Sequence, residues 1–446
     1  GVTPVVCGIC GSTPFPIEDQ IPGYLREMGK RLGVTIDWHG AGEYFDRLDA
    51  AGCAINRIFL VGHSRLRGMA QQGIENRPAS RDELAKMKRT LEQAIKEGAW
   101  GLSAGLMYPP GCYAEQAEIQ SLLETVSDCG AFFSCHLRSE GDHIFDALEE
   151  VVAAAKAARA RLHVSHLKLS GERNWQRVKA LRAACEKAMA RGIEFSADWY
   201  PYLAWNANFD SLLPKWVYEG GTQRLLSRLR DPLLRERLAA HISELSRNNL
   251  PWEKVMVGSV SLPEHASFQG RTIAAVAQEL GLTPEDALFN LILAEGGRAE
   301  GIFFTMSEET QHEIIRWPFV SIGSDGTARA LSGPSSEGFP HPRSYGTAAR
   351  VLRLVRERRL LPLAEAVRRM TSLPAAQLGL RDRGLIQPGM AADIAIFDPA
   401  AVADNSSYEN PTLPPVGIKA VIVNGEIACL DGAWTGARPG KALRRK

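Results

Sequence analysis

The sequence has no long hydrophobic run, no excess of charge of one sign and no concentration of cysteine. Its 446 residues contain 52 Lys and Arg against 51 Asp and Glu, so the formal net charge is +1. A balanced charge lacks the electrostatic footprint of a protein that binds nucleic acid or an anionic membrane, and no apolar run is long enough to span a bilayer. We therefore expect a small-molecule partner, with neither nucleic acid nor membrane; the oligomeric state stays open.

The eight cysteines are spread through the chain, at positions 7, 10, 53, 112, 129, 135, 185 and 429. A disulfide scaffold is therefore not expected. No signal peptide is visible, because residues 1–6 have the pattern of a buried strand instead of a charged region followed by an apolar one. We expect a cytoplasmic location, and we interpret the sequence as starting partway through a domain.

Short apolar runs alternate with longer segments of helical periodicity, which is typical of α/β proteins. Eight segments are candidate strands, one more than we expect the main sheet to use. They are Thr3–Gly8, Arg57–Gly62, Gly98–Leu106, Ala131–Leu137, Arg161–Leu167, Glu194–Trp199, Ile302–Met306 and Phe319–Ser324. The candidate helices are Arg81–Glu97, Glu115–Asp128, Ile144–Ala158, Arg173–Arg191 and Thr347–Glu357. Ser80 with Glu83 predicts a capping box at the first helix.

Chemically reactive residues follow the candidate strands: Cys10, His63, His136, His166 and Asp325. In a parallel (β/α)8 barrel the carboxyl ends of all strands meet on one face, where active sites lie. A doubly wound open sheet would gather ligands from only one or two strands at its switch point. Contributions from four or five strands therefore favour the closed barrel.

The pattern divides the chain into two domains. A barrel is predicted over residues 1–386, with a helical insertion around 203–284. Past Met390, short apolar segments at Asp393–Phe397 and Ile418–Asn424, with an Asn424-Gly425 turn, predict a small β domain over 387–446.

Cys10, His136 and His166 form the strongest candidate site. A single strand-end His is more often a hydrogen-bonded core residue, and a single Cys is more often a small buried hydrophobe. Together, however, one thiolate and two imidazoles suit Zn²⁺, and three protein ligands leave the fourth position that a catalytic zinc needs.

Asp325 closes the last strand on the same face. It could simply cap the following turn. In a zinc hydrolase, a carboxylate there would move a proton from the attacking water to the leaving nitrogen. We therefore predict Asp325 as the catalytic acid and base.

Seven sequence runs resemble those of the N-acyl-D-amino-acid deacylases (D-aminoacylases) of the amidohydrolase superfamily. They are residues 97–111 (EGAWGLSAGLMYPPG), 135–142 (CHLRSEGD), 165–168 (SHLK), 198–202 (DWYPY), 322–326 (IGSDG), 341–346 (HPRSYG) and 388–393 (PGMAAD). The similarity extends from Gly1 to about Gly432. It implies a metal-dependent (β/α)8 barrel with a small β domain, and zinc-dependent hydrolysis of the amide bond of N-acyl-D-amino acids.

The resemblance also implies roles for individual residues. Cys10 matches the cysteine that replaces the bridging carboxylated lysine of related enzymes, His136 and His166 match ligands of the tightly bound zinc, and Asp325 matches the catalytic aspartate. Arg343 and a tyrosine would hold the substrate carboxylate, with Tyr200 preferred over Tyr202. The weaker candidates for the pocket wall are Arg138 and Lys168, for which a structural salt bridge is the alternative. His63, with a phenolic or backbone partner expected, is left out of the metal set.

The sequence departs from the family in one respect, because it contains no His-x-His pair, which the family carries on its first barrel strand. We therefore expect that the first strand and the amino-terminal half of the β domain are absent, and the number of metal ions stays open. Two alternatives remain. One is a dihydroorotase- or hydantoinase-like enzyme for cyclic amides, which normally uses the carboxylated lysine that Cys10 replaces here. The other is a truncated barrel without catalytic activity.

Overall fold

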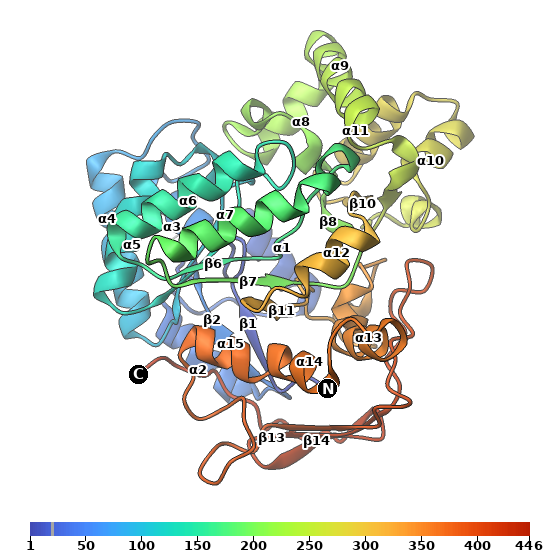
Figure 1. The fold of residues 1–446 in the computed structure, drawn as a ribbon. Coiled ribbons are helices and arrows are strands. Elements are labelled where there is room, and N and C mark those ends of the chain that lie inside the picture. The colour runs from blue at the N-terminus through green and yellow to red at the C-terminus, as the bar shows by residue number, and fades with distance from the viewer. Residues whose placement is uncertain (19–21) are drawn as a thin grey trace.

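The computed structural model describes residues 1–18 and 22–446, and its central feature is a wall of parallel strands (Figure 1). The wall consists of β1 (Pro4–Cys7), β2 (Asn56–Phe59), β3 (Val61–Gly62), β4 (Gly101–Gly105), β5 (Phe132–His136), β6 (Leu162–Val164), β7 (Phe195–Trp199) and β11 (Val320–Ile322). β1 pairs with β2, and β3 to β7 pair in chain order, followed by β11. Only Leu60 separates β2 from β3, and its N–H donates to Cys7 at 3.0 Å, so β2 and β3 continue one strand of the wall.

Helices cover the outer face of this wall (Figure 1). They are α2 (Ala41–Ala51), α3 (His63–Ala70), α4 (Arg81–Lys96), α5 (Gln116–Asp128), α6 (Ile144–Ala158), α7 (Val178–Ala190), α12 (Glu308–Ile314), α13 (Arg343–Arg358), α14 (Leu363–Met370) and α15 (Ser372–Leu378). The helix α1 (Gly23–Leu32), between β1 and α2, lies against Pro334–Ser336 in the segment after β11. Fully buried leucines and valines from both layers form the main core, where each contributes roughly 1.5–3 kcal/mol. The predicted capping box of α4 is confirmed, since Ser80 accepts from the Glu83 N–H.

The insertion contains more strand than the sequence pattern suggests. Its elements are β8 (Ala204–Asn208), α8 (Thr222–Arg230), α9 (Pro232–Asn248), β9 (Val255–Val257), α10 (Ile273–Leu280), α11 (Pro284–Ala294) and β10 (Glu300–Phe304). The assignment of Ile302–Met306 to the barrel is wrong, because β10 pairs antiparallel with β8 and β9 instead. A short apolar run looks the same in either sheet, since periodicity does not identify a strand's partner. The insertion also has a core of its own, around Phe209, Phe289 and Phe303.

The carboxyl-terminal part forms a four-stranded antiparallel sheet, which lies at the opposite end of the molecule from the insertion (Figure 1). Its strands are β12 (Ile394–Phe397), β13 (Ile418–Val423), β14 (Glu426–Leu430) and β15 (Ala433–Trp434). Both hairpin turns use two residues of positive φ: Asn424 and Gly425 at 49° and 88°, and Asp431 and Gly432 at 46° and 81°. Such turns match the twist of the flanking strands.

A buried polar network joins this sheet to the barrel. Asn424 exchanges hydrogen bonds with Asn56 of β2, and Asp393 accepts from Asn56 at 2.9 Å and from Arg383 at 2.5 Å. After β15 the chain returns to the barrel, where the Gly440 N–H donates to Cys53 at 2.8 Å. The predicted boundary at residue 386 stays a prediction.

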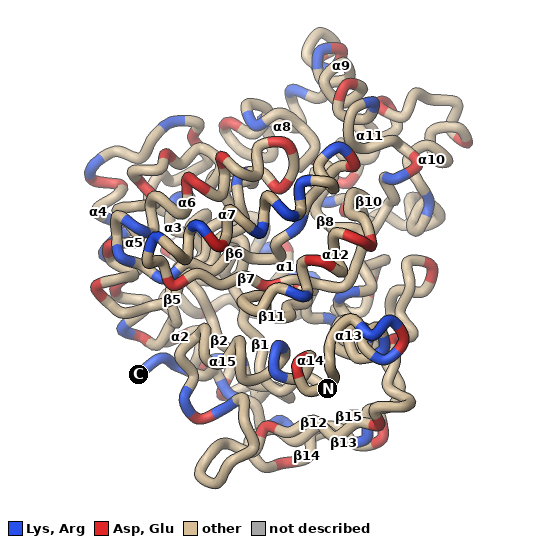
Figure 2. Tube along the Cα trace, in the orientation of Figure 1, with Lys and Arg blue, Asp and Glu red and all other residues tan. Residues whose placement is uncertain are grey.

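Among the described strands, β1 pairs only with β2 and β11 pairs only with β7 in the wall. Closure of the wall by a further strand stays a prediction. None of the helices in the described part of the chain is both long and apolar enough to cross a membrane. Basic and acidic residues are interspersed over the barrel, the insertion and the terminal sheet (Figure 2), as the balanced composition leads one to expect.

Arg369 of α14 anchors β11, the strand that leads to Asp325. Its guanidinium is buried and donates to the backbone carbonyls of Ile315 and of Trp317, the latter at 2.6 Å, while Nε donates to Glu365 at 2.8 Å. The neighbouring Arg368 pairs with the same Glu365 but is far more exposed. The two arginines therefore form a matched pair for testing the anchor.

We expect Arg369→Ala to lower the free energy of unfolding by about 3 kcal/mol, because several buried carbonyl groups lose their donor. Arg368→Ala should change it by less than about 1 kcal/mol, as is usual for an exposed ion pair. Denaturant unfolding followed by circular dichroism measures both. Equal losses in the two variants would show that the buried carbonyl contacts do not stabilise the fold.

Candidate metal centre and active site

The structure brings Cys10, His136 and His166 together at the carboxyl ends of three wall strands. Cys10 follows β1, His136 ends β5 and His166 follows β6. The Cys10 Sγ lies 3.2 Å from His166 Nε2 and 3.6 Å from His136 Nδ1. One donor atom from each residue lies within 4.8 Å of the other two, which is close enough for all three to contact a single ion.

The backbone at this face is held in an unusual conformation. Cys10, His166 and Asp325 all have positive φ, at 57°, 40° and 49°. Such conformations cost of order 1–3 kcal/mol each in non-glycine residues and cluster at functional sites. Gly105, at the end of β4, allows the Cys10 loop to approach, because a Cβ there would lie 2.2 Å from the Cys10 carbonyl oxygen.

The chemistry of the three side chains fits a bound divalent cation. Burial lowers the pKa of His136 well below its ordinary value, so its ring stays neutral and keeps a lone pair for a metal. The nitrogen nearest the Cys10 Sγ is Nδ1, at 3.6 Å, while Nε2 is buried without a hydrogen-bond partner among the residues that the structure describes. Burial, followed by the charge of Asp325, raises the pKa of the Cys10 thiol well above its ordinary value. A thiolate there needs a cation beside it, and metal binding releases the thiol proton.

Glu140 is part of this cluster, although the sequence analysis did not single it out. Its Oε1 lies 2.9 Å from His166 Nδ1 and 2.5 Å from Lys168 Nζ, and its Oε2 lies 3.8 Å from His136 Nε2. Burial alone would raise the pKa of Glu140, but Lys168 and the two histidines lower it well below its ordinary value. The only sequence signal is an acidic residue four positions after a strand-end His, and the course of the intervening loop cannot be read from that spacing.

Asp198 of β7 supports the same region from a neighbouring strand. It accepts from the His166 N–H at 2.8 Å and contacts His163 Nε2 at 2.8 Å. Burial alone would raise its pKa, but the His163 contacts lower it, so Asp198 is a carboxylate. Asp198 belongs to the DWYPY run at residues 198–202, but nothing in that run indicates its contact with His166.

The predicted acid-base residue and the predicted carboxylate-binding residues also meet. The Arg343 Nη1 lies 2.7 Å from Asp325 Oδ2, so the two side chains form an ion pair. The contact does not count as a hydrogen bond from Nη1. The guanidinium carbon and the Lys168 Nζ lie 5.1 and 5.6 Å from the centre of the Tyr200 ring. The Tyr200 hydroxyl and Arg343 Nη1 are buried without a hydrogen-bond partner among the described residues. Such groups usually find a partner, which a bound anion would supply.

Tyr202 faces elsewhere. Its hydroxyl lies 3.4 Å from the Pro342 carbonyl oxygen, and the Arg350 guanidinium lies over its ring at 4.7 Å. Of the two candidate tyrosines, Tyr200 is therefore the one beside Arg343.

Arg138 makes two hydrogen bonds to Glu150, at 2.7 and 2.8 Å, and also donates to the carbonyls of Cys112 and Ala114, so the structural salt bridge that was its alternative role is present. A place for Arg138 in the pocket wall stays a prediction. The expected phenolic or backbone partner of His63 is wrong. Its Nε2 lies 2.7 Å from the Glu118 carboxylate, which also pairs with Arg67. A carboxylate 55 positions away leaves no local sequence signal.

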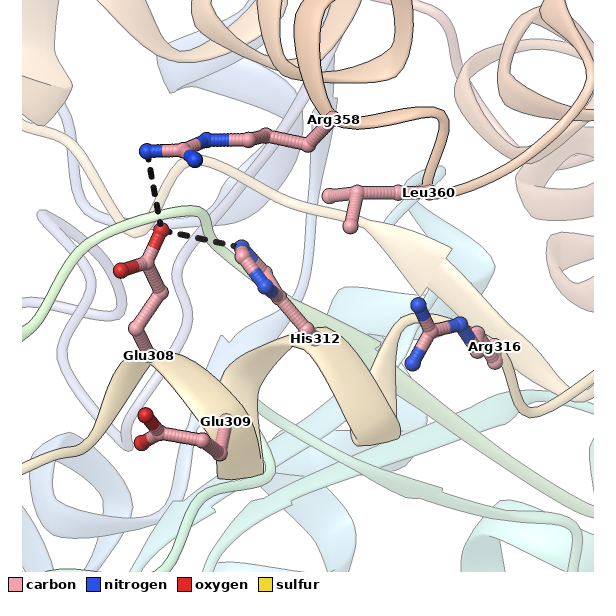
Figure 3. A pocket seen from close by; sticks show the side chains of 6 residues that line it. All are labelled: Glu308, Glu309, His312, Arg316, Arg358 and Leu360. Atoms are coloured by element: carbon pink, nitrogen blue, oxygen red, sulfur yellow. Dashed lines mark ion pairs between the residues drawn. The ribbon is translucent and has the colours of Figure 1, made fainter.

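A surface pocket of about 280 Å³ lies apart from this cluster, between α12 and the end of α13 (Figure 3). Glu308 lies 3.6 Å from His312, one turn along α12, and 3.9 Å from Arg358 of α13. None of its lining residues belongs to the cluster described above.

The chain is similar in sequence to amidohydrolases, and among them to deacylases of N-acyl-D-amino acids. The Amidohydrolase family model matches residues 264–429. A D-aminoacylase from Alcaligenes xylosoxydans xylosoxydans is 34% identical, covering 100% of this chain and 81% of that protein. An N-acyl-D-aspartate deacylase from the same organism is 36% identical, covering 99% and 79%.

The fold is also similar to solved structures of such deacylases. A D-aminoacylase crystal structure superposes with a TM-score of 0.81 at 31% identity, covering 100% of this chain and 83% of that chain. The N-acyl-D-glutamate deacylase of Bordetella bronchiseptica, solved with zinc and a phosphonate inhibitor that mimics the tetrahedral intermediate, gives 0.81 at 32% identity with the same coverage. The chain belongs to the D-aminoacylase (N-acyl-D-amino-acid deacylase) family of the amidohydrolase superfamily, with the amidohydrolase TIM-barrel fold.

Proposed function

We propose that this chain hydrolyses the amide bond of N-acyl-D-amino acids, releasing a carboxylate and a free D-amino acid. The observation that carries the proposal is the convergence of Cys10, His136 and His166, together with the Asp325–Arg343 ion pair, whose charges act on the Cys10 thiol and on the His136 ring. It supports the proposal because residues that can hold a metal would then lie near a carboxylate that can carry a proton and a cation that can bind a carboxylate. The family membership supports it, because relatives at 32–36% identity deacylate N-acyl-D-amino acids, N-acyl-D-aspartate or N-acyl-D-glutamate by name.

Zinc is the metal we expect on Cys10, His136 and His166, since one thiolate and two imidazoles suit it and a relative was solved with zinc. When bound, zinc supplies a nucleophile at neutral pH and polarises the scissile carbonyl. Cys10 contributes the negative charge of the ligand set, and His136 stays neutral because burial lowers its pKa. The three strand ends fix the geometry before substrate arrives.

Asp325 takes the proton from the attacking water and passes it to the leaving nitrogen. In this structure its carboxylate lies against Arg343. A substrate carboxylate competes for the same guanidinium, so binding of substrate frees Asp325 for proton transfer.

Arg343, Tyr200 and Lys168 bind the substrate carboxylate. Arg343 offers a fork of donors that matches a carboxylate, Lys168 adds a second positive charge, and the Tyr200 hydroxyl adds a hydrogen bond. With the carboxylate held here and the acyl carbonyl directed to Cys10, His136 and His166, only one hand of the amino acid places its amide correctly. The names of the three relatives, which all specify D substrates, favour the D form.

A panel of N-acetyl-D- and N-acetyl-L-amino acids, with hydantoin and dihydroorotate as cyclic amides, tests this function on the zinc-loaded chain. We expect kcat/KM for at least one D substrate to exceed that for its L form by at least about 100-fold, because the L form cannot satisfy both anchor points. Preferential hydrolysis of a cyclic amide would support the hydantoinase-like alternative. Zinc binding without any hydrolysis would support a non-catalytic barrel.

Asp325→Asn should leave zinc bound and lower kcat by about 10²- to 10⁴-fold, since an amide cannot accept the proton. We expect no rise in KM, because Arg343 loses a competitor for the substrate carboxylate. Zinc content by elemental analysis and steady-state kinetics measure both effects. Asp286→Asn, which alters an arginine-paired carboxylate in the insertion, is the matched control and should keep its activity. Near-full activity of Asp325→Asn would show that Asp325 is not the proton carrier.

A further inference from the structure

We propose that Glu140 is a positioning residue that holds His166 in the tautomer required for metal binding and fixes Lys168 beside the substrate carboxylate. The inference rests on the proposed function for the identity of the metal and the substrate. It concerns a residue outside the ligand set, on the loop between β5 and α6.

The geometry of His166 is the first step. Its Nε2 lies 3.2 Å from the Cys10 Sγ, so this nitrogen faces the other candidate ligands. The opposite nitrogen, Nδ1, lies 2.9 Å from Glu140 Oε1 and 2.9 Å from Lys168 Nζ. The two neighbours of Nδ1 have opposite demands, because a carboxylate only accepts and an ammonium only donates hydrogen bonds.

The choice between these neighbours decides whether His166 can bind a metal. If Nδ1–H donates to Glu140, the Nε2 lone pair is available to the ion. If Lys168 donated to Nδ1 instead, the neutral ring would carry its proton on Nε2 and could not bind the ion there. Lys168 Nζ lies 2.5 Å from Glu140 Oε1, so one of its three donors already points to the carboxylate, and the negative charge of Glu140 2.9 Å from Nδ1 favours the tautomer with the proton on that nitrogen.

Burial makes the carboxylate effective in this role. The side chains of His166 and Lys168 are 2% and 3% exposed and that of Glu140 is 10% exposed, so water competes little for these contacts. Asp198 holds the His166 backbone N–H at 2.8 Å. With its backbone fixed by Asp198 and its ring by Glu140, His166 keeps the orientation that its positive φ gives it.

Lys168 links the same carboxylate to substrate recognition. Its Nζ lies 5.6 Å from the centre of the Tyr200 ring, and the guanidinium carbon of Arg343 lies 5.1 Å from the centre of the same ring. Loss of Glu140 would therefore disturb both metal affinity and the binding of the substrate carboxylate.

The chain offers a matched control in a second buried carboxylate. Glu118 contacts His63 Nε2 at 2.7 Å and pairs with Arg67, and all three side chains are at most 5% exposed. This cluster has the same kinds of groups, a carboxylate with a histidine and a cation. None of its members belongs to the candidate metal cluster.

The test compares Glu140→Gln and Glu118→Gln in the full chain by titration with Zn²⁺ against a chromophoric chelator and with Co²⁺ by absorption. We expect Glu140→Gln to weaken Zn²⁺ binding by about 10- to 100-fold, as is usual when the hydrogen-bond partner of a ligating His is removed. We also expect it to shift the Co²⁺ absorption bands and raise KM. The folded Glu118→Gln protein should bind both metals as the unaltered chain does.

Unchanged Zn²⁺ affinity and Co²⁺ bands in Glu140→Gln would overturn the inference while leaving the proposed function intact. Absence of Zn²⁺ binding to the unaltered chain would overturn the proposed metal site itself. If Glu140→Gln does not fold, Glu140→Asp carries the test with Glu118→Asp as control. The shorter arm keeps the charge but cannot reach both His166 and Lys168, so weaker Zn²⁺ binding is again expected, and affinity equal to the unaltered chain contradicts the role.

Discussion

The meeting of one thiol and two imidazoles at a buried point is the constraint on which the rest of the site depends. Cys10, His136 and His166 come from three strands, and their donor atoms converge within 4.8 Å. Buried polar groups are costly unless they have partners. His136 Nδ1 and His166 Nε2 are the ring nitrogens that face Cys10, and burial raises the pKa of the Cys10 thiol. A divalent cation at this point would accept the lone pairs of both nitrogens and stabilise the thiolate.

Much of the surrounding structure can be understood as support for that point. Gly105 allows the Cys10 loop to approach β4, Asp198 holds the His166 backbone, and Glu140 lies between His166 and Lys168. Farther out, Arg369 ties the segment before Asp325 to α14. Three site residues keep left-handed backbone conformations that would be unfavourable in isolation. The barrel therefore stabilises a local geometry that the site residues would not adopt alone.

The sequence predicted the parts of this structure that local pattern determines. The Ile144–Ala158 helix, the Ser80 cap and the Asn424-Gly425 turn depend on neighbours along the chain and agree with the structure. Cys10, His136 and His166 could be grouped because parallel strand ends meet on one face, and the family motifs agreed. Features that depend on long-range partners were missed, left open or wrong: Glu140 was not singled out, Arg138 had both the pocket wall and a salt bridge as alternatives, and β10 belongs to the insertion. Periodicity gives no information about these long-range partners.

X-ray absorption at the zinc edge of the purified chain tests whether Cys10, His136 and His166 hold one zinc ion. We expect one sulfur ligand at about 2.3 Å and nitrogen or oxygen ligands at about 2.0–2.1 Å. The sulfur contribution should disappear in Cys10→Ser. A zinc environment without sulfur, or one whose sulfur ligand survives the loss of Cys10, would show that zinc is not held at this site.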